Sequence, residues 1–242
     1  MQTPREVTDQ LLRHGNPERI GIIDSHWPDA IAAWVRQGYP TRMVFKKKGQ
    51  DRWRREDGMA EEVLVDGEYE EPIPPWEHFG FDMVGTGGWF DLMPLRDYEE
   101  LLEETDAWTI KRNGAGAALK FWKHKSGTPE HVDFLMTSRE RWERDYRPHL
   151  MKWDEKRMGD IELQLQNTQE ARQAQRWVHY GHMFIWEAMR QSMGDVTLYE
   201  SLVLDPDWIH DYNRVYTDLF KKAFAYLFEK LGLPDGIWLY EA

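Results

Sequence analysis

The amino-acid sequence predicts an α/β fold in which short parallel strands alternate with longer helices. Four apolar runs are too short to be buried helices, and we therefore expect them to be buried strands. These runs are residues 20–24, 79–84, 177–181 and 237–240. Long segments with helical periodicity separate them, and strands joined by helical connections lie parallel in one sheet with right-handed crossovers. The sequence therefore predicts four strand–helix units.

The first predicted strand is flanked by helix signals. Thr3 and Glu6 have the spacing of a capping box, and Pro4 suits the first helical position. Gly15 is expected to end this helix. A second helix is predicted over residues 29–37, so the strand is expected to lie between two helices in the chain.

Residues 90–136 show a different pattern, in which apolar and polar residues alternate between turn residues. Alternation with a period of two is typical of antiparallel strands. Strands are predicted at residues 107–111, 118–123 and 131–136, with a turn at Asn113. We therefore expect a small antiparallel β insertion after the second parallel strand.

Helical periodicity continues through the rest of the chain. A helix is predicted from residue 137 to about residue 158, with a kink at Pro148. Another is predicted over residues 183–193. The longest follows Asp205, a good N-cap, because apolar residues then recur every three or four positions up to Gly232.

Composition excludes several classes of protein. The 242 residues carry 31 basic and 43 acidic side chains, and the net charge of −12 argues against binding to nucleic acid or an anionic membrane. The chain has no cysteine, which excludes disulfides, thiolate metal ligands and a cysteine nucleophile. No apolar run approaches the ~20 residues of a membrane span, and the N-terminus lacks the features of a secretory signal. We therefore expect a cytoplasmic protein.

Polar side chains follow each of the four predicted strands. Because the carboxyl ends of parallel strands meet at one edge of a sheet, we expect these side chains to surround one site. Carboxylates and imidazoles grouped there can form general acid–base pairs. The expected catalytic residues are Asp82, His179 and Glu241. The expected substrate-binding residues are Asp24, His26, Tyr180, His182 and Tyr240.

Other interpretations of these residues stay open. Asp82 has an alternative role in holding a loop, since aspartate is common where a strand meets a turn. His179 and His182 are three residues apart, but no thiolate is present to complete a soft metal site, so no metal ligand is predicted. The glycine-rich run 85–88 lacks the lysine and the spacing of a phosphate-binding loop. The site is therefore predicted without a metal or a nucleotide.

Several runs, taken in order, resemble the uroporphyrinogen decarboxylase superfamily. Residues 14–22 (HGNPERIGI) resemble its opening, and residues 78–82 (HFGFD) resemble the segment that carries its second strand. Further similar runs are residues 27–38, 114–129, 138–142, 193–194, 205–208 and 232–238. The resemblance covers nearly the whole chain and is greatest to the methyltransferase-like branch.

The resemblance implies a (β/α)8 TIM barrel, of which residues 1–242 form only the first four β/α units with an antiparallel insertion at residues 90–136. The chain would then be a single domain of this superfamily, incomplete at its C-terminus. Asp82 matches the aspartate at the end of the family's second strand. In the decarboxylases that aspartate stabilises the positive charge formed when a pyrrole ring is protonated.

Residues 24–27 (DSHW) favour the methyltransferase-like branch, because true decarboxylases carry arginines here that pair with the substrate's carboxylates. The resemblance therefore implies an enzyme of tetrapyrrole- or corrinoid-linked chemistry, and specifically corrinoid-dependent methyl transfer. Its partners would be a small methylated or tetrapyrrole substrate and a corrinoid protein. Relatives bind zinc in the second half of their barrel, and this chain is expected to hold no cofactor itself.

Two alternatives to methyl transfer stay open. The first is true uroporphyrinogen decarboxylation, a lyase reaction of porphyrin biosynthesis. The second is a non-catalytic half-barrel, an interaction module whose outer strand at residues 237–240 pairs with another chain, for example in a homodimer. Binding of uroporphyrinogen would support the first alternative, and self-association would support the second.

Overall fold

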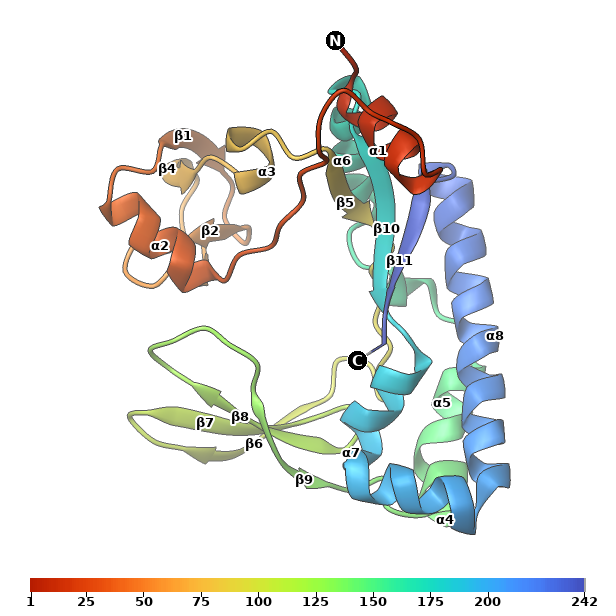
Figure 1. The fold of residues 1–242 in the computed structure, drawn as a ribbon. Helices are drawn as coiled ribbons and strands as arrows, with labels where there is room; N and C mark the ends of the chain where they lie inside the picture. The colour runs from red at the N-terminus through yellow and green to blue at the C-terminus, as the bar shows by residue number, and fades with distance from the viewer. Residues whose placement is uncertain (242) are drawn as a thin grey trace. The chain divides into compact units, whose positions relative to one another are not determined.

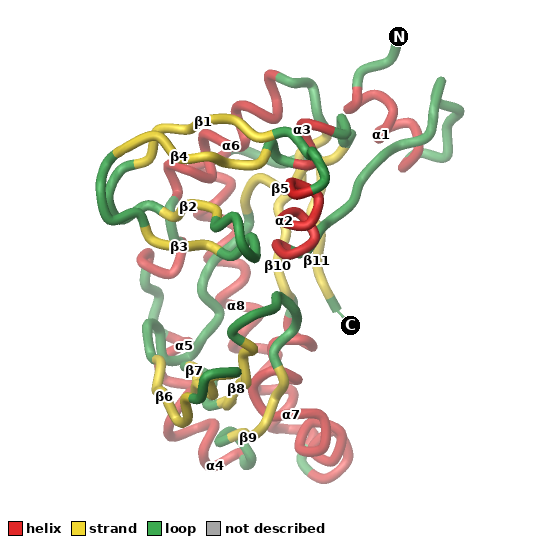
Figure 2. The backbone as a smooth tube through the Cα atoms, turned by 90° about the vertical axis from the view of Figure 1, so that its left-hand side faces the viewer, coloured by secondary structure: helices red, strands yellow, loops and turns green. Residues whose placement is uncertain are grey.

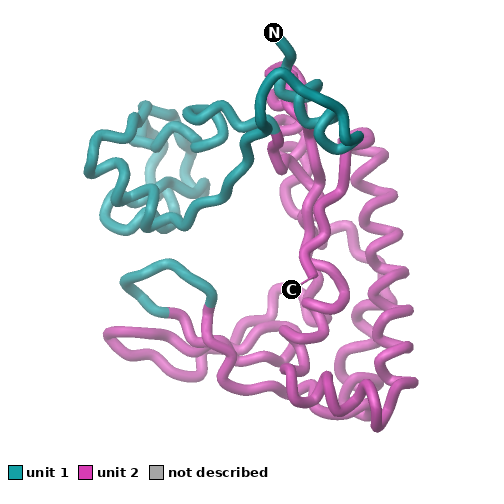
Figure 3. The backbone as a smooth tube through the Cα atoms, viewed as in Figure 1, with its two compact units in different colours: residues 1–82, 122–128 teal, residues 83–121, 129–242 magenta. Residues whose placement is uncertain are grey.

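The computed structural model describes residues 1–241 and divides the chain into two compact units (Figures 1 and 3). The first unit comprises residues 1–82 with residues 122–128, and the second comprises residues 83–121 with the chain from residue 129 onward. The assignment of the whole chain to one domain stays a prediction. In residues 1–241 we find no helix with the length and apolarity that a membrane crossing requires.

The first unit consists of short helices and two small antiparallel sheets (Figure 2). Its elements are α1 (Pro4–Leu12), α2 (Pro28–Arg36), β1 (Thr41–Lys46), β2 (Asp51–Trp53), β3 (Ala60–Glu62), β4 (Gly67–Pro72) and α3 (Pro75–His78). The predicted capping box of α1 is confirmed: the Glu6 N–H donates to the Thr3 hydroxyl, and the Thr3 N–H donates to the Glu6 carboxylate at 2.8 Å. β1 pairs with β4 and β2 pairs with β3.

The strand predicted at residues 20–24 is wrong, because these residues form an extended loop. Ile20 is 79% exposed. The Asp82 N–H donates to the Ile22 carbonyl at 2.8 Å, and the Ile22 N–H donates to the Asp82 carboxylate at 2.7 Å. These bonds join one pair of residues and form no ladder, and an apolar run without a ladder is not a strand.

A three-stranded parallel sheet lies at the centre of the second unit (Figure 1). Its strands are β5 (Met83–Gly87), β10 (Trp177–Met183) and β11 (Gly236–Tyr240). The order is β11-β10-β5, and β10 pairs in parallel with both neighbours. The strands predicted at residues 177–181 and 237–240 are confirmed, while the strand predicted at residues 79–84 begins later, at Met83.

The prediction of a (β/α)8 barrel present as its first four units is wrong. The described residues form four separate sheets of two, three, two and four strands, and only the three-stranded sheet is parallel. That sheet ends at β5 on one side and at β11 on the other, so it does not close. The loop at residues 20–24 contributes no strand, and three parallel strands with two open edges are too few for a barrel.

Helices and helical turns supply most of the core residues of the second unit. They are α4 (Arg139–Arg141), the π-helical turn η1 (Trp142–Tyr146), α5 (Arg147–Met151), the 3-10 turn η2 (Glu155–Met158), α6 (Ile161–Gln173), α7 (Ile185–Leu204) and α8 (Pro206–Leu231). α6 lies against β5 and β10, and α8 carries the apolar stripe that the sequence predicts. The Asp205 carboxylate accepts the Trp208 N–H at 3.3 Å, which confirms Asp205 as the cap of α8.

A four-stranded sheet in the order β6-β7-β8-β9 follows β5 in the chain. Its strands are β6 (Glu99–Glu104), β7 (Trp108–Asn113), β8 (Ala117–Trp122) and β9 (Glu130–Phe134). β7, β8 and β9 coincide within a few residues with the three strands predicted here. β6 was not predicted, because its sequence EELLEE has no alternation with a period of two.

Candidate functional site

The position of β5 decides which aspartate follows the second strand of the sheet. Asp82 comes immediately before β5, at its amino end. The first carboxylate beyond the carboxyl end of β5 is Asp91. Sites in parallel sheets form at the carboxyl ends of the strands. Because β5 starts later than predicted, the carboxylate at this edge of the sheet is Asp91 and not Asp82.

Asp82 is fully buried in the first unit, and both of its carboxylate oxygens are bound. Arg19 donates from Nη1 to Oδ2 at 2.8 Å and from Nη2 to Oδ1. The Ile22 N–H also donates to Oδ2, at 2.7 Å. These contacts give Asp82 the loop-holding role that the sequence left open.

Asp24 and His26 also lie in the first unit, whereas the parallel sheet lies in the second. The Asp24 carboxylate is exposed and lies 3.8 Å from His26 Nδ1. The His26 ring packs edge-on against Trp34, with 4.7 Å between the ring centroids, and against Phe79 and Phe81. An imidazole among three aromatic rings packs as part of a small core.

His179 and Tyr180 lie in the middle of β10, on opposite faces of the sheet. Tyr180 is fully buried, and its hydroxyl donates to the Gly232 carbonyl at 2.8 Å. On the other face the His179 ring lies 5.5 Å from the Trp238 ring, and its Nδ1 has no hydrogen-bond partner in the described chain. Burial lowers the pKa of His179. Neither residue reaches the carboxyl edge of the sheet.

Tyr240 and Glu241 lie at the carboxyl end of β11, as predicted. The Glu241 carboxylate accepts the N–H groups of Trp186 and Glu187 at 3.3 and 3.1 Å. These are among the first N–H groups of α7, so Glu241 caps this helix from another element. The side chain of Tyr240 is half exposed.

A cavity of about 130 Å³ lies at the carboxyl ends of β5 and β10. Its lining combines apolar side chains with a few polar groups. The lining residues are Trp89, Phe90, Asp91, Leu92, Met93, Ala115, His182, Met183, Ala188, Gln191, Ser192 and Tyr216. A concave lining that is mainly apolar with a few polar groups is typical of small-molecule sites, so this cavity is the candidate site.

Asp91 is the carboxylate of this cavity. Its Oδ1 accepts the Met93 N–H at 2.8 Å, while Oδ2 has no hydrogen-bond partner within residues 1–241. Burial raises the pKa of Asp91, and the Met93 N–H and the positive charge of Arg157 oppose this only in part. Asp91 therefore combines a free oxygen with an increased affinity for a proton.

His182 is held between two backbone carbonyls. Its Nδ1 lies 2.7 Å from the Met183 carbonyl, and its Nε2 lies 2.7 Å from the Phe90 carbonyl. A neutral ring can donate to only one of them, whereas a protonated ring donates to both. Burial lowers the pKa of His182, and both carbonyls and Asp91 oppose this effect. The ring thus ties β10 to the loop that carries Asp91.

Two hydroxyls complete the polar part of the lining. The Tyr216 hydroxyl donates to the Leu92 carbonyl at 3.1 Å. The Ser192 hydroxyl donates to the Ala188 carbonyl at 2.6 Å and lies 3.3 Å from the Tyr212 hydroxyl. Burial raises the pKa of Tyr216 well above its ordinary value, so this phenol stays neutral and is a hydrogen-bond donor.

Of the residues predicted for the site, His182 lies in the lining of this cavity. Glu241 lies at the start of α7. The sequence missed Asp91, Ser192 and Tyr216. Asp91 had a usable signal, because it follows the glycine-rich run 85–88 that ends the second strand. No sequence signal distinguishes Ser192 and Tyr216, because their positions on predicted helices are typical of ordinary core residues.

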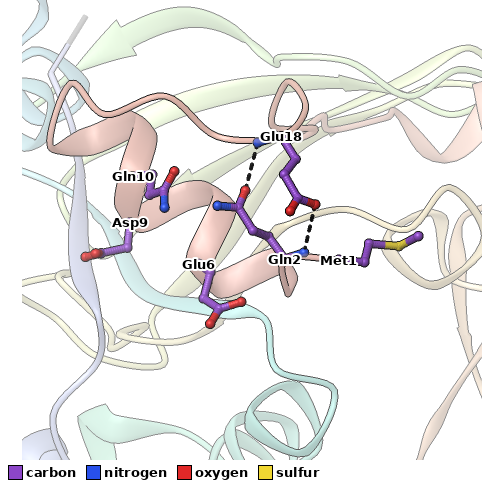
Figure 4. A pocket seen from close by; sticks show the side chains of 6 residues that line it. All are labelled: Met1, Gln2, Glu6, Asp9, Gln10 and Glu18. Atoms are coloured by element: carbon purple, nitrogen blue, oxygen red, sulfur yellow. Dashed lines mark hydrogen bonds between the residues drawn. The ribbon is translucent and has the colours of Figure 1, made fainter.

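A second cavity, of about 300 Å³, lies at α1 in the first unit (Figure 4). Its lining is Met1, Gln2, Glu6, Asp9, Gln10 and Glu18. The Gln2 N–H donates to the Glu18 carboxylate at 3.2 Å, and the Glu18 N–H donates to the side-chain oxygen of Gln2 at 2.8 Å, as the dashed lines show. Glu6 belongs to the capping box. These carboxylates therefore hold the N-terminal turn together.

Within the described part of the chain, no three His, Asp or Glu side chains are grouped so that they could hold a metal ion. Zinc, which the family resemblance implies for relatives, therefore has no fitting ligand set among these residues. The function proposed for this chain includes no metal that the chain itself holds.

Comparison with known proteins adds no relative. No protein-family model, no curated protein and no solved structure matches this chain.

Proposed function

We propose that the chain is an enzyme that transfers a proton to a small methylated substrate in the cavity at the carboxyl ends of β5 and β10, within corrinoid-linked methyl transfer. Asp91 is the proton donor. The single observation that carries the proposal is the half-buried Asp91 carboxyl in the cavity lining, whose Oδ2 accepts no hydrogen bond from the described residues and whose pKa is raised by partial burial. The methyl-transfer class rests on the sequence resemblance.

The size of the cavity favours a small substrate. Ligand cavities for drug-sized molecules occupy about 300–1,000 Å³, and a tetrapyrrole is larger than most drugs. A cavity of about 130 Å³ suits a methyl ether, amine or thioether of a few heavy atoms. This supports methyl transfer over uroporphyrinogen decarboxylation, which would have to enclose four pyrrole rings.

The proposed step needs one proton. A substrate R–X–CH3 loses its methyl group to a nucleophile on the partner protein, the C–X bond breaks, and its electron pair stays on X. Asp91 donates its proton to X, so that R–XH leaves and the Asp91 carboxylate remains. General acid catalysis of this kind contributes about 10²–10⁴-fold to a rate.

The reaction can be assayed with the purified chain, free cob(I)alamin and anisole, trimethylamine or dimethyl sulfide, by following methylcobalamin absorbance. We expect Asp91→Asn to lower the rate by about 100-fold. Asp207→Asn, an exposed carboxylate in the first turn of α8, is the matched control. Because the acid form of Asp91 donates, the wild-type rate should fall as pH rises through its raised pKa.

Two results would overturn the proposal. One is the absence of methyl transfer with all three substrates. The other is a rate that Asp91→Asn and Asp207→Asn leave equally unchanged. Saturable uroporphyrinogen binding that survives Ala188→Leu, a variant that fills the cavity, would favour the decarboxylase alternative at another place in the chain.

A non-catalytic interaction module is the second candidate, and the exposure of β11 favours it. β11 is an outer strand of its sheet, and Ile237, Trp238, Leu239 and Tyr240 are 41–51% exposed. An apolar outer strand is a template for pairing with another chain. Light scattering tests this: dimers that dissociate on Leu239→Lys would support it, and a monomer at about 100 μM would contradict it.

A further inference from the structure

The largest cavity described in the second unit has no part in the function proposed above. It occupies about 950 Å³ and opens to solvent beside η2. Two segments form its walls, residues 94–98 after β5 and residues 148–157 around the end of α5. Its volume lies within the range of sites for drug-sized ligands.

The charge of this cavity is opposite to that of the chain. Four cationic side chains line it, Arg96, Lys152, Lys156 and Arg157, against two carboxylates, Asp97 and Asp154. The chain as a whole has a net charge of −12. A local excess of positive charge on an acidic protein concentrates anions at that place.

Arg157 supplies a buried positive charge at the wall of the cavity. It is only 3% exposed, and its guanidinium donates to the carbonyls of Asp91, Met93, Pro94 and His149 at 2.7–3.4 Å. Its Nε has no hydrogen-bond partner, and no carboxylate pairs with it among residues 1–241. A buried charge whose partners are all neutral favours an anion close by.

Lys152 and Lys156 provide two cationic groups of the lining. Both side chains are exposed, and neither makes an ion pair within the described chain. Arg96 differs, because it bonds to Asp154 at 3.2 Å and also pairs with Asp97. The two lysines are therefore free to bind a ligand, while Arg96 shapes the wall.

The rest of the lining is mostly apolar and aromatic, with His149 as a further polar side chain. Trp153 packs on Tyr226 of α8, with 6.3 Å between the ring centroids, and Pro94, Leu95 and Pro148 also line the cavity. Aromatic and proline side chains offer flat surfaces to a planar molecule. The lining thus combines apolar and aromatic side chains with an excess of cationic ones.

We propose that this cavity binds a planar small molecule that carries two acidic groups, carboxylate or phosphate. The apolar body lies against Trp153, and the acidic groups are bound by Lys152 and Lys156 in the field of Arg157. Its lining shares no residue with the cavity around Asp91, but the charge of Arg157 also acts on the Asp91 carboxylate.

The test uses two probes that separate the sources of negative charge, 2,6-naphthalenedicarboxylate and 1-naphthyl phosphate. Binding to the full chain is measured by calorimetry at about 20 mM and about 200 mM salt, because exposed charge pairs weaken as salt rises. We expect saturable binding of at least one probe. Its affinity should fall about tenfold in Lys152→Gln and in Lys156→Gln, as expected for a lost hydrogen bond to a charged group.

The matched control is Lys222→Gln, which removes the same charge from an exposed position on α8 outside the cavity. It should leave the affinity unchanged. A second readout is Trp153→Phe, which should remove the fluorescence change on binding while the other tryptophans remain. The proposal fails if neither probe binds, or if Lys222→Gln weakens binding as much as the two lysine variants do.

Discussion

Arg19 binds both carboxylate oxygens of Asp82, and Nη1 of Arg19 lies 2.8 Å from Oδ2 of Asp82. The carboxylate is fully buried, whereas the side chain of Arg19 is 39% exposed. Each partner comes from a segment that has no ladder of its own. The ion pair therefore replaces the strand pairing expected for residues 20–24.

We predict that Asp82→Asn destabilises the protein by about 1–3 kcal/mol, because the Arg19 guanidinium and the Ile22 N–H lose a charged acceptor. Asp24→Asn is the control, since the Asp24 carboxylate is 67% exposed and has no arginine partner among the described residues. We expect it to change stability by less than about 0.5 kcal/mol. Urea unfolding followed by circular dichroism measures both. Equal effects of the two variants would show that the ion pair does not hold the loop.

The stability of the fold should fall as the solution becomes acidic. The pKa of His182 is lowered below its ordinary 6.5 by burial, so below that pH the unfolded chain binds a proton that the folded chain does not. Stability is therefore lost as pH falls from 6.5 through the lowered pKa. Urea midpoints between pH 7.5 and pH 5 measure the slope. His182→Gln should make the slope smaller, since His179 and His131, whose pKa values are also lowered by burial, supply the rest. An unchanged slope would contradict the assignment to His182.

Replacing Glu241 should weaken the start of α7. Its carboxylate binds the N–H groups of Trp186 and Glu187, and the loss of such a cap costs about 0.5–2 kcal/mol. Glu200→Ala, at an exposed position within α7, is the control. We expect Glu241→Ala to lower the free energy of unfolding and Glu200→Ala to leave it nearly unchanged. The role of Glu241 would be refuted by two variants of equal stability.

Gly88 cannot accept a side chain without a shift of β10. Its φ is 97°, and a Cβ would lie 2.7 Å from both the Gly181 nitrogen and the Tyr180 Cβ. Gly232 is the control: its φ is 78°, but the nearest atom to a Cβ is 3.5 Å away. We expect Gly88→Ala to cost about 1–3 kcal/mol more than Gly232→Ala in thermal or urea unfolding. A smaller difference would mean that the loop moves freely.

Structural features that depend on residues close together in the chain were predicted correctly from the sequence. The capping box at Thr3 and the cap of α8 at Asp205 depend only on their own segments, and both are confirmed. The barrel depended on strand pairing between distant segments, which no local pattern encodes. Residues 20–24 have strand-like composition, but their backbone bonds to Asp82 join a single pair of residues and form no ladder.

The same distinction applies to the candidate site. His182 and Glu241 were found because they end strands that were placed correctly. Asp91 was missed because the sequence predicts a strand that includes the apolar residues Phe79 and Phe81, which instead pack with His26. A boundary error of a few residues was enough to exchange one aspartate for another.

β5 and β10 are neighbours in the sheet, but the segment from Gly88 to Arg176 separates them in the chain. Pairing of such distant segments is slow, because a long loop must close before any ladder bond forms. The hairpins β6–β9 and the helix α8 consist of local contacts and can form earlier. We therefore expect refolding in at least two kinetic phases, with the cavity around Asp91 formed only in the last one.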